Sequence, residues 1–228
     1  MESPSFSQEL FGYLNDLAAN NERPWFQANK PRYVDHVQEP ALEFINALAP
    51  KLAKISPHFQ ADSRVAGGSL FRIQRDTRFS KDKTPYKTNT GMHFRHDVGK
   101  DAHAPGFYLH LQPGECFAGA GLWRPEPKVA AVIRQAIADD PAGWNKAAHG
   151  KVHAGGWTPM GDSLIRPPKG IDADHPLIED LKRKNFVLSR RLTEAEVTAP
   201  HFIDDFASMC SQVSPYMRFL CQALGVAF

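Results

Sequence analysis

The sequence has no long apolar run, and we expect no secretion signal in its first residues. Although 42% of its 228 residues are hydrophobic, the longest apolar runs fall far short of the ~20 residues that a membrane-spanning helix needs. The opening segment Met1–Pro4 shows no basic stretch followed by an apolar one, which a secretion signal would require. We therefore expect a protein without membrane segments that resides in the cytoplasm.

Cysteine and strong charge of one sign are also scarce. The three cysteines, Cys116, Cys210 and Cys221, are odd in number and form no C-x-x-C pair, which argues against a disulfide framework or a zinc knuckle. The net charge of +2 is too small to hold the whole molecule on nucleic acid or an anionic membrane. Binding of that kind would need a local basic patch.

Apolar material for a core is plentiful, and only 23% of the residues are charged. The chain shows no internal repeat, no linker and no low-complexity tract. Its length suits one large domain better than two. We therefore predict a single domain over residues 1–228.

Apolar residues at helical spacing dominate the first part of the chain. Together with first-turn prolines they predict two or three helices that end near Ser56-Pro57. The C-terminal run Pro200–Leu224 predicts one long amphipathic helix or a pair broken at Ser214-Pro215. Other helices are predicted at Pro125–Asp139, Pro141–Ala148 and Pro176–Lys184.

Short alternating or aromatic-rich segments fill the middle of the chain. The turn Pro113-Gly114 between two of them predicts an antiparallel hairpin. The predicted strands are Ser69–Arg75, Gly91–His96, Gly106–Gln112, Glu115–Trp123 and Phe186–Arg190, with a short one at Leu164-Ile165. These elements predict an α+β fold: a central, mainly antiparallel sheet of about four to six strands, with N-terminal helices, a mid-chain helix and a C-terminal helix packed on it.

Positive charge is concentrated between Arg72 and Lys87. Six cations in this segment stand against only Asp76 and Asp82, a local excess of +4 in a chain whose total is +2. The first four cations recur at every third residue, which fits neither strand alternation nor a helix face. We therefore expect a loop that leaves the strand Ser69–Arg75.

Guanidinium and ammonium groups on a loop suit phosphate or carboxylate recognition. Asp76 and Asp82 lie among cations that lower a carboxyl pKa, so we expect them to act as structural anchors. Arg124 precedes a predicted helix and could join the loop cations. The predicted ligand-binding residues are Arg72, Arg75, Arg78, Lys81, Lys83, Tyr86, Lys87 and Arg124.

Three functions remain open for this loop. The favoured one is binding or processing of an anionic small molecule. A nucleic-acid binding module would use the same cations with Phe79 and Tyr86 as stacking groups, but the modest total charge disfavours it. In a scaffold or partner-binding protein, the aspartates would hold the loop in an internal salt-bridge network. Whether the protein is an enzyme stays open.

Metal and cofactor motifs are missing. His93 and His96 would lie on opposite faces of a strand, and no H-x-H or H-E-x-x-H pattern occurs, so we predict no metal site. Gly119-Ala120-Gly121 lies in the predicted hairpin and does not open a helix, so it predicts close packing instead of a dinucleotide loop, and no cofactor is expected.

Candidates for chemistry are few. Ser80 and Cys116 could be nucleophiles, but neither lies in a recognisable motif or beside a local base. His93, His110 and Glu115 lie on or next to the predicted sheet and could act in acid–base steps. We expect Trp123 to pack in the core or on a lid.

The segments 67–73 and 75–89 resemble the core signature of the conserved family called domain of unknown function 2461. The stretches 119–125, 166–170 and 219–225 agree with that resemblance. It covers nearly the whole chain and implies one domain. Because the family has no assigned activity, the resemblance implies no catalytic residue.

Overall fold

The computed structural model describes residues 6–99 and 104–228. Its centre is a five-stranded antiparallel sheet in the order β1-β2-β3-β5-β4. The α+β prediction is therefore confirmed. The strands are β1 (Thr90–Arg95), β2 (Gly106–Leu111), β3 (Cys116–Leu122), β4 (Thr158–Met160) and β5 (Phe186–Leu192).

The predicted hairpin joins β2 to β3. Gly114 has φ 74°, and the N–H of Glu115 donates to the Gln112 carbonyl at 2.9 Å, which closes the turn. Local turn chemistry thus sets the register of the two central strands. The edge of the sheet opposite β1 is formed by β4. The strand predicted at Leu164-Ile165 is wrong, because its neighbourhood has only an isolated bridge between Ser163 and Arg183.

The N-terminal helices follow one another without long loops. The last of them buries Phe44, Ile45, Leu48 and Leu52 and ends at the expected place before Ser56. They are α1 (Gln8–Ala19), α2 (Arg23–Ala28), α3 (Lys30–Tyr33), the π-helical η1 (Val34–Gln38) and α4 (Glu39–Ile55).

The second half of the chain supplies the remaining helices. The predicted C-terminal helix is a pair broken at Val213, because Pro215 suits the first turn of a new helix and not the interior of a long one. Only one turn of the predicted helix Pro176–Lys184 forms. The helices are α5 (Pro127–Asp139), α6 (Pro141–Ala148), α7 (Lys151–Ala154), α8 (Ile178–Leu181), α9 (Glu194–Val197), α10 (Phe202–Gln212) and α11 (Ser214–Ala223).

The predicted strand Ser69–Arg75 does not form. Its first half bonds to β1, where Phe71 N–H donates to Gly91 O at 2.9 Å. Its second half bonds to the returning limb of the loop, where Arg75 N–H donates to Pro85 O at 2.9 Å. Because the segment changes partner midway, only isolated bridges at Leu70 and Gln74 remain.

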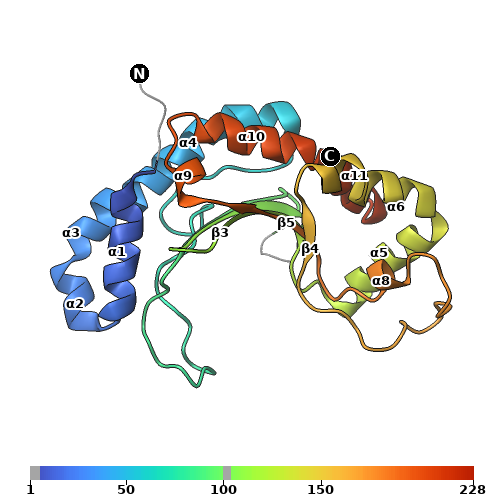
Figure 1. The fold of residues 1–228 in the computed structure, drawn as a ribbon, viewed down its shortest axis with the longest axis horizontal. Coiled ribbons are helices and arrows are strands. Elements are labelled where there is room, and N and C mark those ends of the chain that lie inside the picture. The colour runs from blue at the N-terminus through green and yellow to red at the C-terminus, as the bar shows by residue number, and fades with distance from the viewer. Residues whose placement is uncertain (1–5, 100–103) are drawn as a thin grey trace.

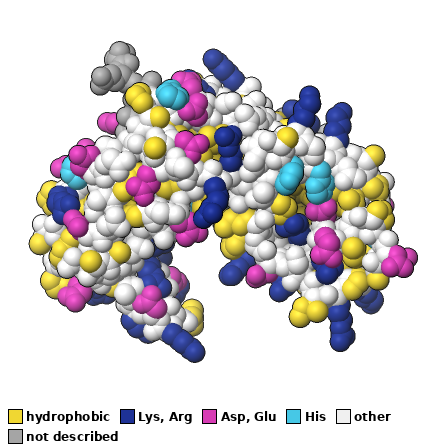
Figure 2. Space-filling view, viewed as in Figure 1, with side chains coloured by type: hydrophobic (Ala, Val, Ile, Leu, Met, Phe, Trp, Pro, Cys, Tyr) yellow, Lys and Arg dark blue, Asp and Glu magenta, His cyan; other side chains and the backbone are white. Residues whose placement is uncertain are grey.

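Helices cover the sheet on one face only. α4 and α10 lie across that face, while α1 to α3 and the group of α5, α6, α8 and α11 extend past the other face at its two sides (Figure 1). Phe94 of β1 contacts Phe206 of α10 with ring centroids 5.8 Å apart. Figure 2 shows the deep hollow left between the two groups. No helix among the described residues is both long and apolar enough to span a membrane.

Candidate functional site

The hollow is floored by the uncovered face of the sheet. Along each strand the side chains alternate between the two faces. Phe107 and Leu109 point to the helices and are fully buried, so their neighbours Tyr108 and His110 point into the hollow. In β1, His93 lies on the same face.

The strand register arranges this face in transverse rows. Residues paired across neighbouring strands share a face, so each row brings together side chains that are distant in sequence. The rows are Gly91–His110–Phe117–Arg191, then His93–Tyr108–Gly119–Ser189–Thr158, then Arg95–Gly106–Gly121–Val187–Met160.

Glycines in these rows leave room for flat rings. A Cβ at Gly91 would lie 2.3 Å from the Tyr108 hydroxyl, and one at Gly106 would lie 2.2 Å from His93 Nε2. The rings of Tyr108 and His93 therefore lie over glycines of the neighbouring strand. At Gly119 a Cβ would meet Tyr108 Cβ at 3.4 Å, Tyr108 Cδ1 at 3.7 Å and Phe117 Cε2 at 3.9 Å, all ordinary contact distances, and the position lines the cavity.

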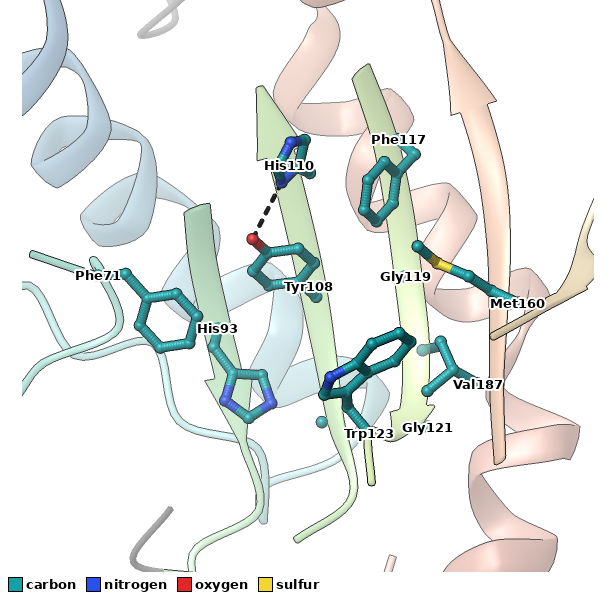
Figure 3. A pocket seen from close by; sticks show the side chains of 12 residues that line it. Phe71, His93, Tyr108, His110, Phe117, Gly119, Gly121, Trp123, Met160 and Val187 are labelled. Atoms are coloured by element: carbon teal, nitrogen blue, oxygen red, sulfur yellow. Dashed lines mark hydrogen bonds between the residues drawn. The ribbon is translucent and has the colours of Figure 1, made fainter. Parts of the chain in front are cut away.

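The result is a cavity of about 300 Å³ on the open face. Its walls are largely apolar, and its polar groups are His93, Tyr108 and His110 (Figure 3). Phe71 and Trp123 are 39% and 40% exposed, unusual for such large apolar side chains. The remaining lining residues are Gly106, Phe117, Gly119, Ala120, Gly121, Met160 and Val187.

Tyr108 and His110 form a hydrogen-bonded pair in this cavity. The Tyr108 hydroxyl lies 3.1 Å from His110 Nδ1. Burial raises the pKa of Tyr108 to about 12, so the phenol keeps its proton at neutral pH. Burial lowers the pKa of His110, although a hydrogen bond with Gln112 acts in the opposite direction. The hydroxyl then donates to a neutral imidazole, an arrangement suited to hydrogen bonding or proton transfer.

Two cations of the predicted set lie against the cavity walls. Lys87 Nζ is 5.4 Å from the centre of the Phe71 ring and donates to the Arg72 carbonyl at 2.9 Å. Arg124 Cζ is 5.7 Å from the Trp123 ring centre. Arg124 is the one non-glycine residue of the described chain with positive φ, at 48°, and its N–H donates to Asn185 Oδ1 at 2.8 Å. That hydrogen bond holds the turn between β3 and α5.

Within the basic loop, the two aspartates bind cations. Asp76 accepts hydrogen bonds from Arg78 at 2.7 and 3.0 Å. Asp82 pairs with Arg75 and accepts from the backbone N–H of Thr84 at 2.9 Å. The hydrogen bonds from Arg78 and Arg75 hold the pKa of Asp76 and of Asp82 at about 2. Both carboxylates are thus charged at neutral pH and fold the loop on itself.

The Tyr86 ring lies in the core and not on the loop surface. It stacks on Phe26 with centroids 4.1 Å apart, and its backbone N–H donates to Asn21 Oδ1 at 3.0 Å. Tyr86 also lines a second cavity, of about 350 Å³. This cavity is lined by Ala18, Asn21, Arg75, Asp82, Thr84, Tyr86, Lys87, Thr88 and Asn89.

The structure therefore divides the predicted ligand-binding set. Lys87 and Arg124 contact the aromatic walls Phe71 and Trp123 of the open-face cavity but do not line the cavity themselves. Arg75, Tyr86 and Lys87 line the second cavity. The exposed side chains of Arg72, Arg78, Lys81 and Lys83 line neither of these two cavities. The loop hangs beside the hollow, next to the N-terminal helices (Figure 1).

The other candidates for chemistry lie in different surroundings. His93 and His110 line the cavity, whereas Glu115 is exposed at the hairpin turn and Ser80 lies on the loop. Cys116 is buried, donates to Gln112 O at 3.3 Å, and has its thiol pKa raised by burial. A thiol held neutral is a poor nucleophile.

Sequence reasoning missed the aromatic members of the cavity. Trp123 was expected to pack in the core or on a lid and not to line a ligand site, but its side chain is 40% exposed and lines the cavity. Tyr108 and Phe71 received no role. The alternation of Tyr108 and His110 with buried residues of β2 placed them on one face. That this face of the sheet is hollow follows only from the pairing of Tyr108 and His110 with glycines of neighbouring strands.

One family model matches residues 9–219, and its description reads conserved hypothetical protein, domain of unknown function 2461. The resemblance inferred from the motifs is thereby confirmed. No curated protein and no solved structure matches the chain.

Proposed function

Because the chain belongs to the domain of unknown function 2461 family, which assigns no activity, we propose from the geometry that the open-face cavity binds a small molecule with a planar apolar part and an anionic group. The observation that carries this proposal is the aromatic-walled cavity around Tyr108 and His110. Concave apolar pockets with a few convergent polar groups are the usual form of small-molecule sites.

The aromatic walls of the cavity are the reason to expect a planar apolar part in the ligand. Phe71, Phe117 and Trp123 present ring faces or edges to the cavity, and Gly119 leaves its floor open. Aromatic pairs are worth about 0.5–1.5 kcal/mol each beyond the burial of apolar area. Filling the cavity would also cover Phe71 and Trp123, whose exposure costs free energy in the empty state.

The nearby cations are the reason to expect an anionic group on the ligand. Lys87 and Arg124 lie over the two exposed aromatic walls, and Arg72 is adjacent to Phe71 in the chain. A carboxylate or phosphate at the mouth of the cavity would meet their ammonium and guanidinium groups, and charge-assisted hydrogen bonds are the stronger kind. Burial lowers the pKa of Lys87, which an anion would raise again.

The Tyr108–His110 pair supplies directional contacts inside the cavity. A protonated phenol and a neutral imidazole can together donate to and accept from a polar group of the ligand. The same pair could move a proton if the ligand reacts, with His110 as base and Tyr108 as donor. Binding alone does not require that step.

Ring-matched probes test the proposal. We expect 2-naphthoate to bind more tightly than uncharged 2-naphthalenemethanol by isothermal titration calorimetry. Gly119→Val should abolish binding of both, because its side chain would fill the cavity floor. Gly12→Ala, with nothing near the added Cβ, is the control for glycine replacement. Lys87→Gln should weaken naphthoate alone, whereas Lys81→Gln in the same loop should change neither.

Two results would reject the proposal. One is equal affinity of the charged and uncharged probes in the wild-type protein. The other is binding that survives Gly119→Val while circular dichroism shows that this variant is folded, because the probes would then occupy another surface.

Nucleic-acid binding is the second candidate, and one observation favours it. Phe79 is 95% exposed, and Arg78 Cζ lies 5.8 Å from its ring centre. An exposed aromatic ring beside a guanidinium is a stacking platform for a base. Binding of single-stranded oligonucleotide should then weaken with added salt and be lost in Phe79→Ala. A salt-independent response would reject it.

A further inference from the structure

Three potential metal ligands meet at the end of β1, on the helix-covered side of the sheet. His58, His96 and Asp97 each offer a ligand atom, and these atoms all lie within 4.8 Å of one another. The backbone bridge between Phe59 and His96 brings the first histidine to the other two residues. The prediction of no metal site rested on the opposite faces of His93 and His96 and on the absence of local ligand motifs, and a cluster that joins His58 to residues almost forty positions later has no such motif.

The hydrogen bonds of His96 fix which nitrogen can bind a metal. Its Nε2 lies 2.7 Å from the carbonyl oxygen of Ala227. Because a carbonyl can only accept, Nε2 carries the proton and donates it. Nδ1 of the neutral ring is then an acceptor, which agrees with the 3.2 Å hydrogen bond from Val98 N–H. Histidine ligands of metals commonly donate their second N–H to a backbone carbonyl in this way.

The surroundings of His96 Nδ1 favour a bound cation. Nδ1 lies 3.0 Å from Asp97 Oδ1, so two electron-rich atoms face each other. The His96 residue is fully buried. A metal ion bound by both atoms would remove the repulsion. Val98 N–H also donates to the Asp97 carboxylate. This N–H therefore keeps a hydrogen-bond acceptor when His96 Nδ1 binds the metal.

His58 completes the set from the solvent side. Its Nδ1 lies 3.0 Å from Asp97 Oδ2, and its ring is parallel to that of His96 at 5.4 Å. The side chains of His58 and Asp97 are 32% and 36% exposed, so an ion and a water ligand can enter. Metal–ligand bonds of about 2.0–2.1 Å in a tetrahedron need ligand atoms about 3.3 Å apart. The two 3.0 Å separations run to different oxygens of Asp97 and lie near that spacing, and all three ligand atoms lie within 4.8 Å of one another. Because the two imidazole rings are parallel, the half-exposed His58 ring would turn to point its nitrogen at the same ion.

We propose that His58, His96 and Asp97 form a binding site for one divalent transition-metal ion, with Zn²⁺ as the best match. Two imidazoles and a carboxylate suit Zn²⁺ and leave a fourth position for water. The site would join the loop after α4, the end of β1 and the C-terminal segment at Ala227. Phe59 strengthens that link, since its ring contacts both His96 and Phe228. The metal site would thus link these three segments, and it is separate from the open-face cavity.

Calorimetric titration of the chelator-treated protein with ZnCl₂ tests the site. We expect one saturable site in the wild-type protein and a loss of affinity of at least ~10-fold in Asp97→Asn and His58→Gln, because each replaces a ligand while keeping side-chain size. His153→Ala, an exposed histidine outside the cluster, should bind Zn²⁺ as the wild type does. Zn²⁺ should also raise the melting temperature of the wild type and of His153→Ala, but not of Asp97→Asn.

Two outcomes would overturn the proposal. Equal Zn²⁺ affinity in the wild type and in folded Asp97→Asn would place the metal elsewhere. No Zn²⁺ binding, together with a melting temperature that depends on pH in the wild type and not in Asp97→Asn, would assign the cluster to a histidinium–carboxylate pair. Neither outcome bears on naphthoate binding, so the two proposals are tested separately.

Discussion

Gly119 and Gly121 lie two residues apart on the same face of β3, yet an added methyl group should affect them very differently. At Gly121 the backbone has φ 130°, and a Cβ would lie 1.9 Å from the carbonyl oxygen of Phe186. At Gly119 the φ is ordinary and the nearest atom is Tyr108 Cβ at 3.4 Å. The pair therefore separates a glycine required by the fold from one that only borders the cavity.

The expected cost follows from two contributions. A non-glycine residue in a sparsely populated φ/ψ region costs about 1–3 kcal/mol. Contact with Phe186 O would also force β5 away from β3 where Gly121 pairs with Val187, and each weakened ladder hydrogen bond costs about 0.5–1.5 kcal/mol. With one weakened ladder bond, Gly121→Ala should thus lower the free energy of unfolding by about 1.5–4.5 kcal/mol, a large share of the usual ~5–15 kcal/mol. Gly119→Ala should change it by less than about 1 kcal/mol in either direction.

Urea unfolding followed by circular dichroism measures both values in one experiment. The midpoint of Gly121→Ala should fall steeply while that of Gly119→Ala stays near the wild type. Equal midpoints for the two variants would refute the reasoning, since the β3–β5 register would then tolerate a side chain at Gly121. A large loss for Gly119→Ala would show that the space beside Tyr108 is filled.

Three further predictions concern packing and charge. Tyr86→Ala should lower the free energy of unfolding by about 3 kcal/mol in urea, because it removes the ring stacked on Phe26, whereas Phe79→Ala should change it by less than about 0.5 kcal/mol. Because burial lowers the pKa of His110, its NMR titration should have a midpoint below 6.5. The unfolded chain then binds a proton at a higher pH than the folded protein does, so the free energy of unfolding should fall as the pH drops below 6.5. Asp82 has a folded pKa of about 2 against 3.8 in the unfolded chain, so the stability it contributes should be complete above pH 3.8 and lost toward pH 2. Thermal melts of Asp82→Asn should lose this part of the pH dependence and keep the part that Asp76 contributes.

Elements with strong local signals could be predicted from the sequence. The hairpin at Pro113-Gly114 follows from turn chemistry, and the break between α10 and α11 follows from Pro215. The strand predicted at Ser69–Arg75 failed because local composition does not say which partner a segment meets. Ser69 and Phe71 bond to β1, whereas Ile73 and Arg75 bond to the loop's returning limb.

The site could be predicted only in part, for a similar reason. Asp76 and Asp82 are near their arginines in the chain, so their ion pairs could be anticipated. The cavity depends on the register that sets Tyr108 beside Gly119 and lays its hydroxyl over Gly91. Such pairings between strands are set by the global fold, and local sequence does not contain them.

The basic loop and the cavity are best understood together. Pairing with Asp76 and Asp82 neutralises Arg78 and Arg75, so the excess charge on the loop rests on Arg72, Lys81, Lys83 and Lys87. Of these, Lys87 is the half-buried one, and it lies on the ring of Phe71. The internal ion pairs fix the loop, and the fixed loop holds Phe71 and Lys87 at the cavity wall. If the cavity binds an anionic ligand as proposed, the salt-bridge network would position Lys87, the cation that meets the ligand.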